Sequence, residues 1–398
     1  MNYKKLDTCV ACGLTELEPF LDLDEQPLAN NYHSGEGGGD SYPLALNVCK
    51  SCWHTQLSVS VDPKILFEHY LYVTGMNETI KAYSKSFAEM VNSELYIDWT
   101  PSVLDIACND GTQLDEFKKL GFDTHGVDPA KNLAELSKDR GHNITVDFWP
   151  TDLERHFDVI TAQNVCAHTP DPLQFLIGVA NHLLPTGTAY IQTSQSQMYQ
   201  NSEFDTVYHE HISFFSTNSM KVLAKRAGLT LVDVKLTSIH GTSYVFVLKH
   251  SNDIQNSVPD MISTEIADGR YNLDFYRQFG EKADAILTKL NYVIESLKLI
   301  SPGVKIVGYG AAAKGMTVLN AKNIQLDWIV DDSPHKVGLF TPGTNIEIKD
   351  RSSLNTTDKI IVIPLAWNFF DEIKANVEEI RGKDETRFIK YFPEVGIE

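Results

Sequence analysis

Four residues with proton-transfer chemistry stand side by side at Tyr208-His209-Glu210-His211. Two imidazoles, a carboxylate and a phenol in one short stretch make a general acid–base site plausible near neutral pH. The stretch belongs to a segment, 194–215, that follows an apolar strand, and such segments lie near the ligand crevice of an open α/β sheet. Two alternatives remain open: a metal site that uses His209 and His211, and a structural hydrogen-bond network.

A second group with defined chemistry is the pair of CxxC motifs, Cys9 with Cys12 and Cys49 with Cys52. Two such pairs can grip a zinc ion tetrahedrally, and four thiolates leave no open position for a reacting water. We therefore predict a structural zinc site in a small domain that the metal helps to fold, with loops and short strands. The alternative, two redox dithiols, would require a thioredoxin-like strand–helix setting that the sequence does not show.

The stretch 103–128 has the pattern of a nucleotide-binding βαβ unit. An apolar strand is followed by the turn Asn109-Asp110-Gly111, by apolar residues at helical spacing, and by Asp128 about 20 residues after the turn, where an acid can bind ribose hydroxyls. Ala107 and Asn109 stand where a dinucleotide fingerprint has glycines. A ligand with adenosine but no phosphate on the turn, S-adenosylmethionine, fits this pattern; an ordinary α/β turn is the alternative.

The strands that follow indicate a class I methyltransferase sheet. Residues 157–162 and 188–193 read as buried strands, and 229–236 and 244–248 alternate like a closing β-hairpin. A dinucleotide-dependent dehydrogenase would instead end in another parallel crossover. Residues 163–168, which include Asn164 and His168, follow the carboxyl end of a strand, where open sheets bind ligands.

A long amphipathic helix over about 275–293 is expected to separate two lobes. The second lobe begins with an apolar strand and the turn that contains Gly308, Gly310 and Lys314. Amides at a helix N-terminus and a lysine can hold a phosphate, although close strand–helix packing also explains the glycines. Before the first sheet, residues 62–99 have a helical pattern that contains Tyr70 and Tyr72, read either as core residues or as a lid over the substrate.

Length and charge set the frame for these motifs. The 398 residues predict an α/β protein with a zinc domain at 1–65, a Rossmann-like methyltransferase domain at 66–250 and a second Rossmann-like domain at 251–398. The net charge of −19 argues against nucleic acid and anionic membranes as partners. The sequence has no apolar stretch of transmembrane length and no signal-peptide pattern, so we expect a cytoplasmic protein.

In this order the motifs resemble one family, the three-domain sugar C-methyltransferases that act on nucleotide-linked 4-keto-hexoses, and the resemblance covers nearly the whole chain. The closest likeness is to the C-3 methyltransferases of TDP-4-keto-deoxysugars. The motifs that carry it are the two CxxC pairs, Leu104-Asp105, Asn109-Asp110-Gly111, Gly126-Val127-Asp128-Pro129, Asn164-Val165-Cys166-Ala167-His168, Tyr208-His209-Glu210-His211, Gly308-Tyr309-Gly310-Ala311-Ala312-Ala313-Lys314-Gly315 and Pro342-Gly343-Thr344.

The resemblance implies a role for each motif. His211 would remove the proton next to the C-4 ketone, Glu210 and Tyr208 would position the sugar or support the imidazole, His168 would donate to the enolate oxygen, and Tyr70 or Tyr72 would close the site. The sugar diphosphate is assigned to Gly308, Gly310 and Lys314. The residues expected to hold S-adenosylmethionine are Asp105, Ala107, Asn109, Gly111, Asp128, Pro129, Asp147, Phe148 and Asn164.

Three other functions are weighed against this one. Attack by a hydroxyl would make the protein a sugar O-methyltransferase. The turn at Gly308 could instead serve an NAD(P)-dependent sugar oxidoreductase, but the glycine fingerprints in both lobes are incomplete. A zinc-ribbon adaptor without catalysis would have no need of the cluster at 208–211.

Overall fold

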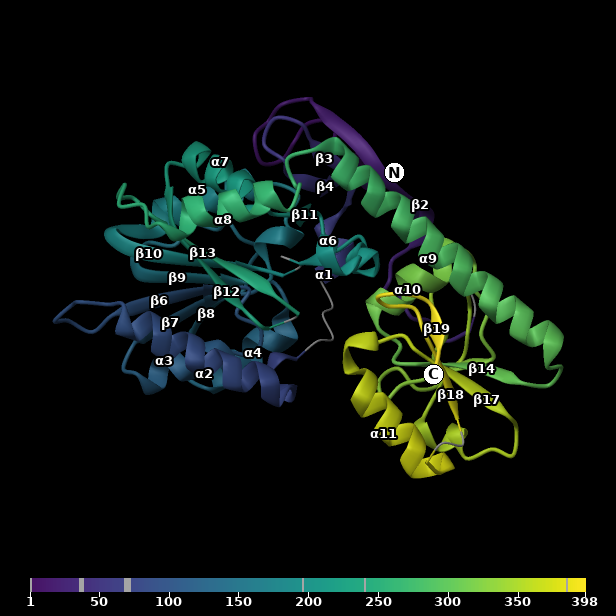
Figure 1. The fold of residues 1–398 in the computed structure, drawn as a ribbon. Helices are drawn as coiled ribbons and strands as arrows, with labels where there is room; N and C mark the ends of the chain where they lie inside the picture. Colours follow the sequence, from purple (N-terminus) through teal and green to yellow (C-terminus); the bar gives the residue numbers. More distant parts are fainter. Residues whose placement is uncertain (1, 36–38, 68–72, 195–196, 240, 384–385) are drawn as a thin grey trace.

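The computed structural model describes residues 2–35, 39–67, 73–194, 197–239, 241–383 and 386–398. It has three parts: a β-rich N-terminal part, an α/β domain built on a large mixed sheet, and a C-terminal α/β domain (Figure 1). The two α/β domains lie on either side of the view, and the N-terminal part lies above and between them (Figure 1). This is the three-part α/β architecture that the sequence predicts.

The N-terminal part is a twisted hairpin with small additions. Its main sheet has the order β11-β4-β3-β2, in which β11 (Ser213–Phe214) comes from a later segment of the chain. Strand β3 alternates between buried and less buried residues because one face covers the core. We expected short strands here, but β2 and β3 span 11 and 9 residues and form a long antiparallel ribbon. The strands are β1 (Tyr3–Lys5), β2 (Leu17–Pro27), β3 (Ser41–Cys49), β4 (Thr55–Leu57) and β5 (Val59–Val61).

The methyltransferase-like domain has the sheet order β12-β13-β10-β9-β6-β7-β8, with β13 antiparallel to both neighbours. The predicted parallel sheet with a closing hairpin is confirmed. Helices α2, α3 and α4 lie on one side of this sheet and α5, α7 and α8 on the other (Figure 1), so the central strand β6 is buried along its whole length. The strands are β6 (Ser102–Ile106), β7 (Asp123–Val127), β8 (Asn143–Thr145), β9 (Phe157–Gln163), β10 (Leu183–Thr193), β11 (Ser213–Phe214), β12 (Thr230–Thr237) and β13 (Ser243–Lys249).

The helical pattern predicted over 62–99 resolves into separate pieces: α1, η1 and α2. Asn77 caps α2 by accepting the backbone N–H of Ile80 at 3.2 Å, which fixes where that helix begins. The helices of this domain are α1 (Pro63–Phe67), η1 (Thr74–Met76), α2 (Glu78–Ser93), α3 (Thr112–Lys119), α4 (Lys131–Asp139), η2 (Cys166–His168), α5 (Pro172–His182), α6 (Met198–Asn201), η3 (Phe204–Thr206), α7 (Thr217–Arg226) and α8 (Ser257–Ala267).

The C-terminal domain repeats the parallel arrangement with the order β16-β15-β14-β17-β18-β19, in which only the pairing of β18 with β19 is antiparallel among the described strands. Its strands are β14 (Lys305–Tyr309), β15 (Trp328–Val330), β16 (Ile348–Lys349), β17 (Ile360–Pro364), β18 (Arg387–Lys390) and β19 (Gly396–Ile397). Its helices are α9 (Leu273–Ile300), α10 (Ala313–Ala321), η4 (Arg351–Leu354), η5 (Trp367–Phe369) and α11 (Phe370–Arg381).

Helix α9, which we expected to separate two lobes, stands between the two α/β sheets in the chain and packs against two parts of the molecule. Its buried residues Phe279, Ile286 and Leu290 belong to one apolar cluster that also contains Leu21 of β2 and Ile306 of β14. The helix runs from the N-terminal part down to the C-terminal domain (Figure 1) and joins them through this shared core. The helix has the predicted amphipathic period, and its apolar face packs against both the N-terminal part and the C-terminal domain.

Candidate active site

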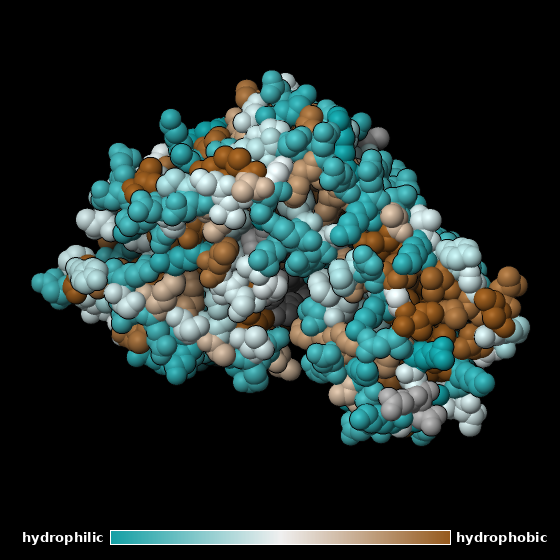
Figure 2. Space-filling view, in the orientation of Figure 1, coloured by the Kyte–Doolittle hydropathy of each residue, from teal (hydrophilic) through white to brown (hydrophobic). Residues whose placement is uncertain are grey.

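One large cavity, of about 1920 Å³, opens where the three parts meet. The surface is hollowed between the methyltransferase-like domain and the C-terminal domain (Figure 2). Gly111, Gly308 and Gly310 are not among its lining residues, and Tyr70 and Tyr72 lie outside the described residues. The predicted site residues that line it are Asp105, Ala107, Asn109, Asp128, Pro129, Asp147, Phe148, Asn164, His168, Tyr208, Glu210, His211 and Lys314.

The turn after β6 is a compact loop with left-handed residues. Ala107, Asn109 and Gly111 have φ values of 60°, 51° and 81°, and the amide of Ala107 donates to the carbonyl of Val127 at 2.7 Å. Gly111 caps α3, and a Cβ there would collide with the Ser137 hydroxyl. The left-handed φ of Ala107 explains why a glycine also suits this position.

Two buried carboxylates stand at the ends of neighbouring strands. Asp128 accepts the amides of Asn109 and Ala130, each at 2.8 Å, and Asp105 accepts the Thr161 hydroxyl at 2.7 Å. Burial raises the pKa of the Asp105 carboxyl to about 7 and also raises the pKa of Asp128. A carboxylate offers about four acceptor positions, so Asp128 keeps capacity for two ribose hydroxyls after holding the turn.

The structure also shows buried polar atoms that are suited to a ligand. Asn164 Oδ1 and Gln192 Nε2 are buried, belong to residues that line the cavity, and have no hydrogen-bond partner among the described residues. An unpaired acceptor and an unpaired donor at the carboxyl edge of the sheet match the ammonium and carboxylate of a bound amino-acid moiety. The residues present therefore fit S-adenosylmethionine at this edge.

The cofactor turn is covered by the segment that precedes α2. The amide of Thr74 donates to Asn109 Oδ1 at 3.0 Å, and the amide of Gly75 donates to Asp110 Oδ2 at 3.2 Å. Arg140 also donates to the same Asp110 oxygen at 3.0 Å. Asn109 and Asp110 thus do more than make a turn: their side chains fix η1 over the cofactor edge.

His211 is held in one tautomer by its neighbours. Its Nδ1 lies 2.7 Å from the carbonyl oxygen of Thr206, which can only accept, so Nδ1 carries the proton and donates it. Its Nε2 is then the acceptor for the hydroxyl of Tyr208 at 2.8 Å. In its neutral form the imidazole therefore directs a basic nitrogen, Nε2, at a phenol, which is the arrangement that a general base requires.

The other residues of the cluster divide between the cavity and the core. Glu210 accepts the side-chain amide of Asn30 at 2.6 Å, and burial raises the pKa of its carboxyl. The ring of His168 lies 5.0 Å from that of His211, and burial lowers the pKa of His168 to about 4, which keeps it neutral. His209 does not line the cavity; it lies 3.3 Å from the carbonyl of Tyr42 and acts as a core residue.

In the C-terminal domain, only one of the three predicted substrate-binding residues, Lys314, lines the cavity; Gly308 and Gly310 do not. The Cβ of a residue at Gly308 would press on Leu365 and Ile329, and that at Gly310 would press on Ala366. These glycines therefore permit close packing in the C-terminal sheet, the alternative that the sequence left open. Lys314 lines the cavity, 3.9 Å from Glu203 and 4.9 Å above the ring of Trp367. Binding of substrate by these three residues stays a prediction.

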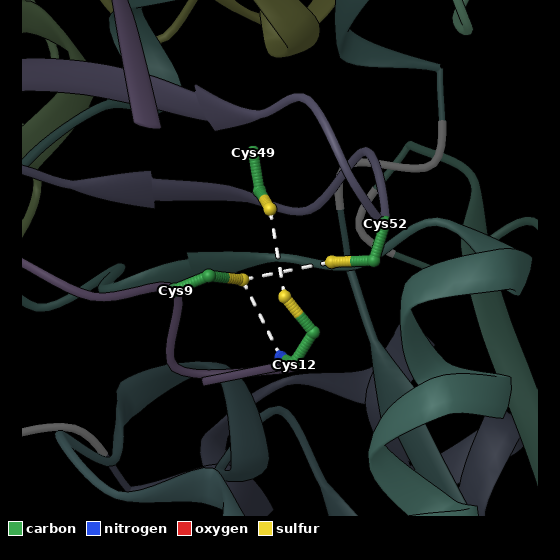
Figure 3. A group of neighbouring side chains, drawn as sticks. All are labelled: Cys9, Cys12, Cys49 and Cys52. Carbon is green, nitrogen blue, oxygen red and sulfur yellow. Dashed lines mark hydrogen bonds between the residues drawn. The ribbon is translucent and has the colours of Figure 1, made fainter. Parts of the chain in front are cut away.

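The four cysteines come together as predicted (Figure 3). Their sulfur atoms all lie within 4.8 Å of one another, with 3.5 Å between Cys9 and Cys52 and between Cys12 and Cys49. Tetrahedral zinc with bonds of about 2.3 Å to sulfur needs thiolates roughly 3.8 Å apart, so this set fits the ion. Among the described residues it is the one group of three or more ligating side chains able to hold a metal.

Sequence reasoning missed several residues of the cavity. Asn30 and Tyr32, from the N-terminal part, line it, and so do Glu203 and Gln192. Asp205 is fully buried beside it, accepts the indole N–H of Trp367 at 2.6 Å, and has its pKa raised by burial to about 6. Asn30 and Tyr32 had no signal, because the polar run at 30–34 matches no motif with a known chemistry; Asp205 stands three residues before Tyr208 and could have been noticed.

A class I sheet, a turn closed by an acidic residue and a cavity at its carboxyl edge define an S-adenosylmethionine-dependent methyltransferase with a zinc-binding N-terminal domain. Comparison with family models agrees. A methyltransferase domain model matches residues 76–234, a zinc binding domain model matches 9–67, and a C-methyltransferase C-terminal domain model matches 238–393.

The chain is similar to individual proteins over very different shares of its length. The C-methyltransferase NovU of Streptomyces niveus is 28% identical over 98% of this chain and 96% of its own length. A ubiquinone biosynthesis O-methyltransferase of Coxiella burnetii is 25% identical over 35% of this chain and 66% of its own length. The magnesium protoporphyrin IX methyltransferase of Synechocystis, solved with bound S-adenosylmethionine, is 11% identical, with a TM-score of 0.34 over 43% of this chain and 79% of that one.

The chain therefore carries the three domains of these models in order, and it is an enzyme that transfers the methyl group of S-adenosylmethionine to carbon. The O-methyltransferase, oxidoreductase and adaptor alternatives are therefore set aside. Within the described residues, no helix has both the length and the apolar character needed to cross a membrane.

Proposed function

We propose that the enzyme methylates a nucleotide-linked 4-keto-deoxyhexose, most simply a TDP sugar, at C-3, through an enolate that His211 generates in deoxysugar biosynthesis. The observation that carries this proposal is the pairing of His211, whose Nδ1 is held by the Thr206 carbonyl, with Tyr208 in the same cavity as the cofactor turn. Hydroxyl methylation needs only removal of an oxygen-bound proton, whereas carbon methylation requires a carbanion, and a neighbouring ketone makes one accessible.

The proton balance follows from the hydrogen bonds. The proton at C-3 passes to Nε2 of His211, either directly or through Tyr208, whose phenol proton moves to Nε2 while its oxygen takes the substrate proton. The electron pair left behind forms the enolate, with its charge on the C-4 oxygen. The Thr206 carbonyl stabilises the imidazolium that results because Nδ1–H keeps its acceptor.

When bound, S-adenosylmethionine supplies an electrophilic methyl group on its sulfonium. The protein's task is to hold the sugar carbon in line with that group and to stabilise the developing oxyanion. Glu210 is suited to accept a sugar hydroxyl, and the buried, neutral His168 beside His211 is suited to donate to the enolate oxygen.

The C-terminal wall of the cavity supports a nucleotide sugar as the substrate. Lys314 and Lys336 both line this wall, beside the carboxylates of Glu203 and Asp332, and their ammonium groups are suited to bind a diphosphate. The ammonium of Lys314 lies 4.9 Å above the indole of Trp367, and its ion pair with Glu203 is long, at 3.9 Å. We assign the diphosphate to this wall, near the start of α10.

The test is product analysis by mass spectrometry with a panel of nucleotide-linked sugars and a deuterated methyl donor. Each 4-keto-deoxyhexose should be matched with the same sugar reduced to the 4-hydroxyl. The proposal expects a methyl group on carbon only with the keto members. A methyl group on oxygen, or methylation of the reduced sugars at a comparable rate, would contradict it.

A further inference from the structure

The zinc domain contacts the methyltransferase-like domain at the reactive segment itself. Strand β11, which begins two residues after His211, pairs with β4 of the zinc domain: Ser213 lies opposite Gln56 and Phe214 opposite Thr55. The amide of Leu57 also donates to the carbonyl of Ile212 at 2.9 Å. The chain that carries the base is therefore one strand of the zinc-domain sheet.

The zinc ligands are close in sequence to this pairing. His54, two residues after Cys52, is fully buried, and its Nε2 lies 3.2 Å from the Ser213 hydroxyl. Its backbone carbonyl accepts a hydrogen bond from the amide of Cys49. Asn218 donates to the carbonyl of Cys52 at 3.0 Å. A zinc ion that holds Cys49 and Cys52 would therefore also hold β4, the strand that pairs with β11 of the reactive segment.

A second contact reaches the cavity. Asn30 follows β2, and its side-chain amide donates to Oε1 of Glu210 at 2.6 Å; both residues line the cavity. The loop around Asn30 is anchored on the C-terminal domain, because Tyr32 donates to the carbonyl of Ala311 at 2.6 Å and His33 exchanges backbone hydrogen bonds with Phe340. Asn30 is therefore held from both sides.

We propose that the zinc domain forms a wall of the active site and that Asn30 is a positioning residue that orients the Glu210 carboxylate toward the sugar. With Oε1 engaged by Asn30, the carboxylate cannot rotate freely, and Oε2 is left to accept a hydroxyl of the bound hexose. The Asn30 donor also favours the ionised carboxylate that burial disfavours. Tyr32 is the nearby titratable group from the same loop; burial raises its pKa, and the charges of Asp331 and Glu210 raise it further.

This inference rests on the proposed function only for its kinetic consequence. The variants are Asn30→Ala, which removes the donor, and Asn30→Asp, which keeps the shape but sets a carboxylate against Glu210. Asn47→Ala, on β3 of the same domain and not a lining residue of the cavity, is the matched control. All are prepared zinc-loaded, with circular dichroism and zinc content checked.

Loss of a hydrogen bond to a charged group should lower kcat on the keto-sugar roughly 10- to 100-fold in Asn30→Ala and at least as much in Asn30→Asp, with S-adenosylhomocysteine affinity kept within about twofold. Asn47→Ala should match the wild type. If Asn30 only fills space, Asn30→Asp will turn over like the wild type, and that result overturns the proposal.

A measurement without sugar separates this inference from the proposed function. The carboxyl carbon of Glu210, assigned in an NMR spectrum by comparison with Glu210→Gln, is titrated in the protein bound to S-adenosylhomocysteine. The pKa of Glu210 should rise in Asn30→Ala because the donor is lost. An unchanged pKa would sink the positioning role, even if no keto-sugar proved to be a substrate.

Discussion

The two α/β domains close their first turns with the same hydrogen bonds. In the methyltransferase domain, Ala107 donates to Val127, and Asp128 accepts the amides of Asn109 and Ala130. In the C-terminal domain, Gly310 donates to Val330 at 2.7 Å, and Asp331 accepts the amides of Ala311 and Ser333 at 2.7 and 2.8 Å. An acid at the end of the second strand thus holds the turn in each domain, whatever ligand it binds.

The difference lies in what else the turns contact. The side chains of Asn109 and Asp110 in the first turn hold η1, and the same cavity is lined by Asn164 and Gln192, each with a buried polar atom that has no partner within the described residues. The second is shorter and built of alanines, and its Ala311 carbonyl is already occupied by Tyr32 and by Lys336 at 2.7 Å. The first turn is therefore arranged for a ligand that spans the sheet edge, and the second is partly closed by the protein itself.

Replacing the two acids should separate their roles most clearly. Asp128→Ala should weaken S-adenosylhomocysteine binding by roughly 10- to 100-fold, because a charged acceptor of ribose hydroxyls is lost, as isothermal calorimetry would measure. Asp331→Ala should leave that affinity within about twofold and raise the KM for the nucleotide sugar instead. Equal losses of cofactor affinity in both variants would show that the turns are not specialised as described.

The two α/β domains also contact the zinc domain in different ways. A substitution at Gly280 tests the contact between α9 and β2. A Cβ at this position of α9 would run into the carbonyl oxygen of Phe20 on β2. Alanine usually stabilises a helix relative to glycine by roughly 0.5–1 kcal/mol, but here overpacking should cost about 1–3 kcal/mol. Gly280→Ala should lower the thermal unfolding temperature, whereas Lys289→Ala, on the exposed side of α9, should not; a stabilised Gly280→Ala protein would refute this contact.

The smallest effect concerns the equivalent positions Ala107 and Gly310, with φ values of 60° and 88°. Ala107→Gly removes the strain of a left-handed alanine, about 1 kcal/mol, but it also raises the conformational entropy of the unfolded chain, which costs a similar amount. The free energy of unfolding should therefore change by less than about 1 kcal/mol. Gly310→Ala adds that strain and a Cβ 2.9 Å from the Cβ of Ala366, so it should destabilise. Thermal unfolding of the pair should show this asymmetry; equal shifts of the same sign would contradict it.

Much of the fold could be predicted because its signals are local. The CxxC spacing predicts the cysteine cluster, and the apolar runs predict β6, β9, β14 and β17. The role of α9 could not be read in this way, because an amphipathic stripe shows that a face is buried without showing that two partners share it. The long ribbon β2–β3 was underestimated for a similar reason: its alternation depends on long-range pairing.

The candidate site was predictable where residues act within one short segment. His211 and Tyr208 are three residues apart and meet because one turn brings them together. Asn30, by contrast, is 180 residues from Glu210, and no pattern in the chain marks the contact. The glycines at 308 and 310 had an ambiguous signal, since tight packing and phosphate binding both favour glycine.

Solvent-deuterium exchange is the most direct test of the central claim, that His211 removes a carbon-bound proton beside the bound cofactor. With S-adenosylhomocysteine in place of the methyl donor, the wild-type enzyme should exchange the hydrogen next to the ketone of its sugar. His211→Ala should exchange at least about 100-fold more slowly while binding S-adenosylhomocysteine as tightly as the wild type. Exchange at a near wild-type rate in that variant would contradict the account.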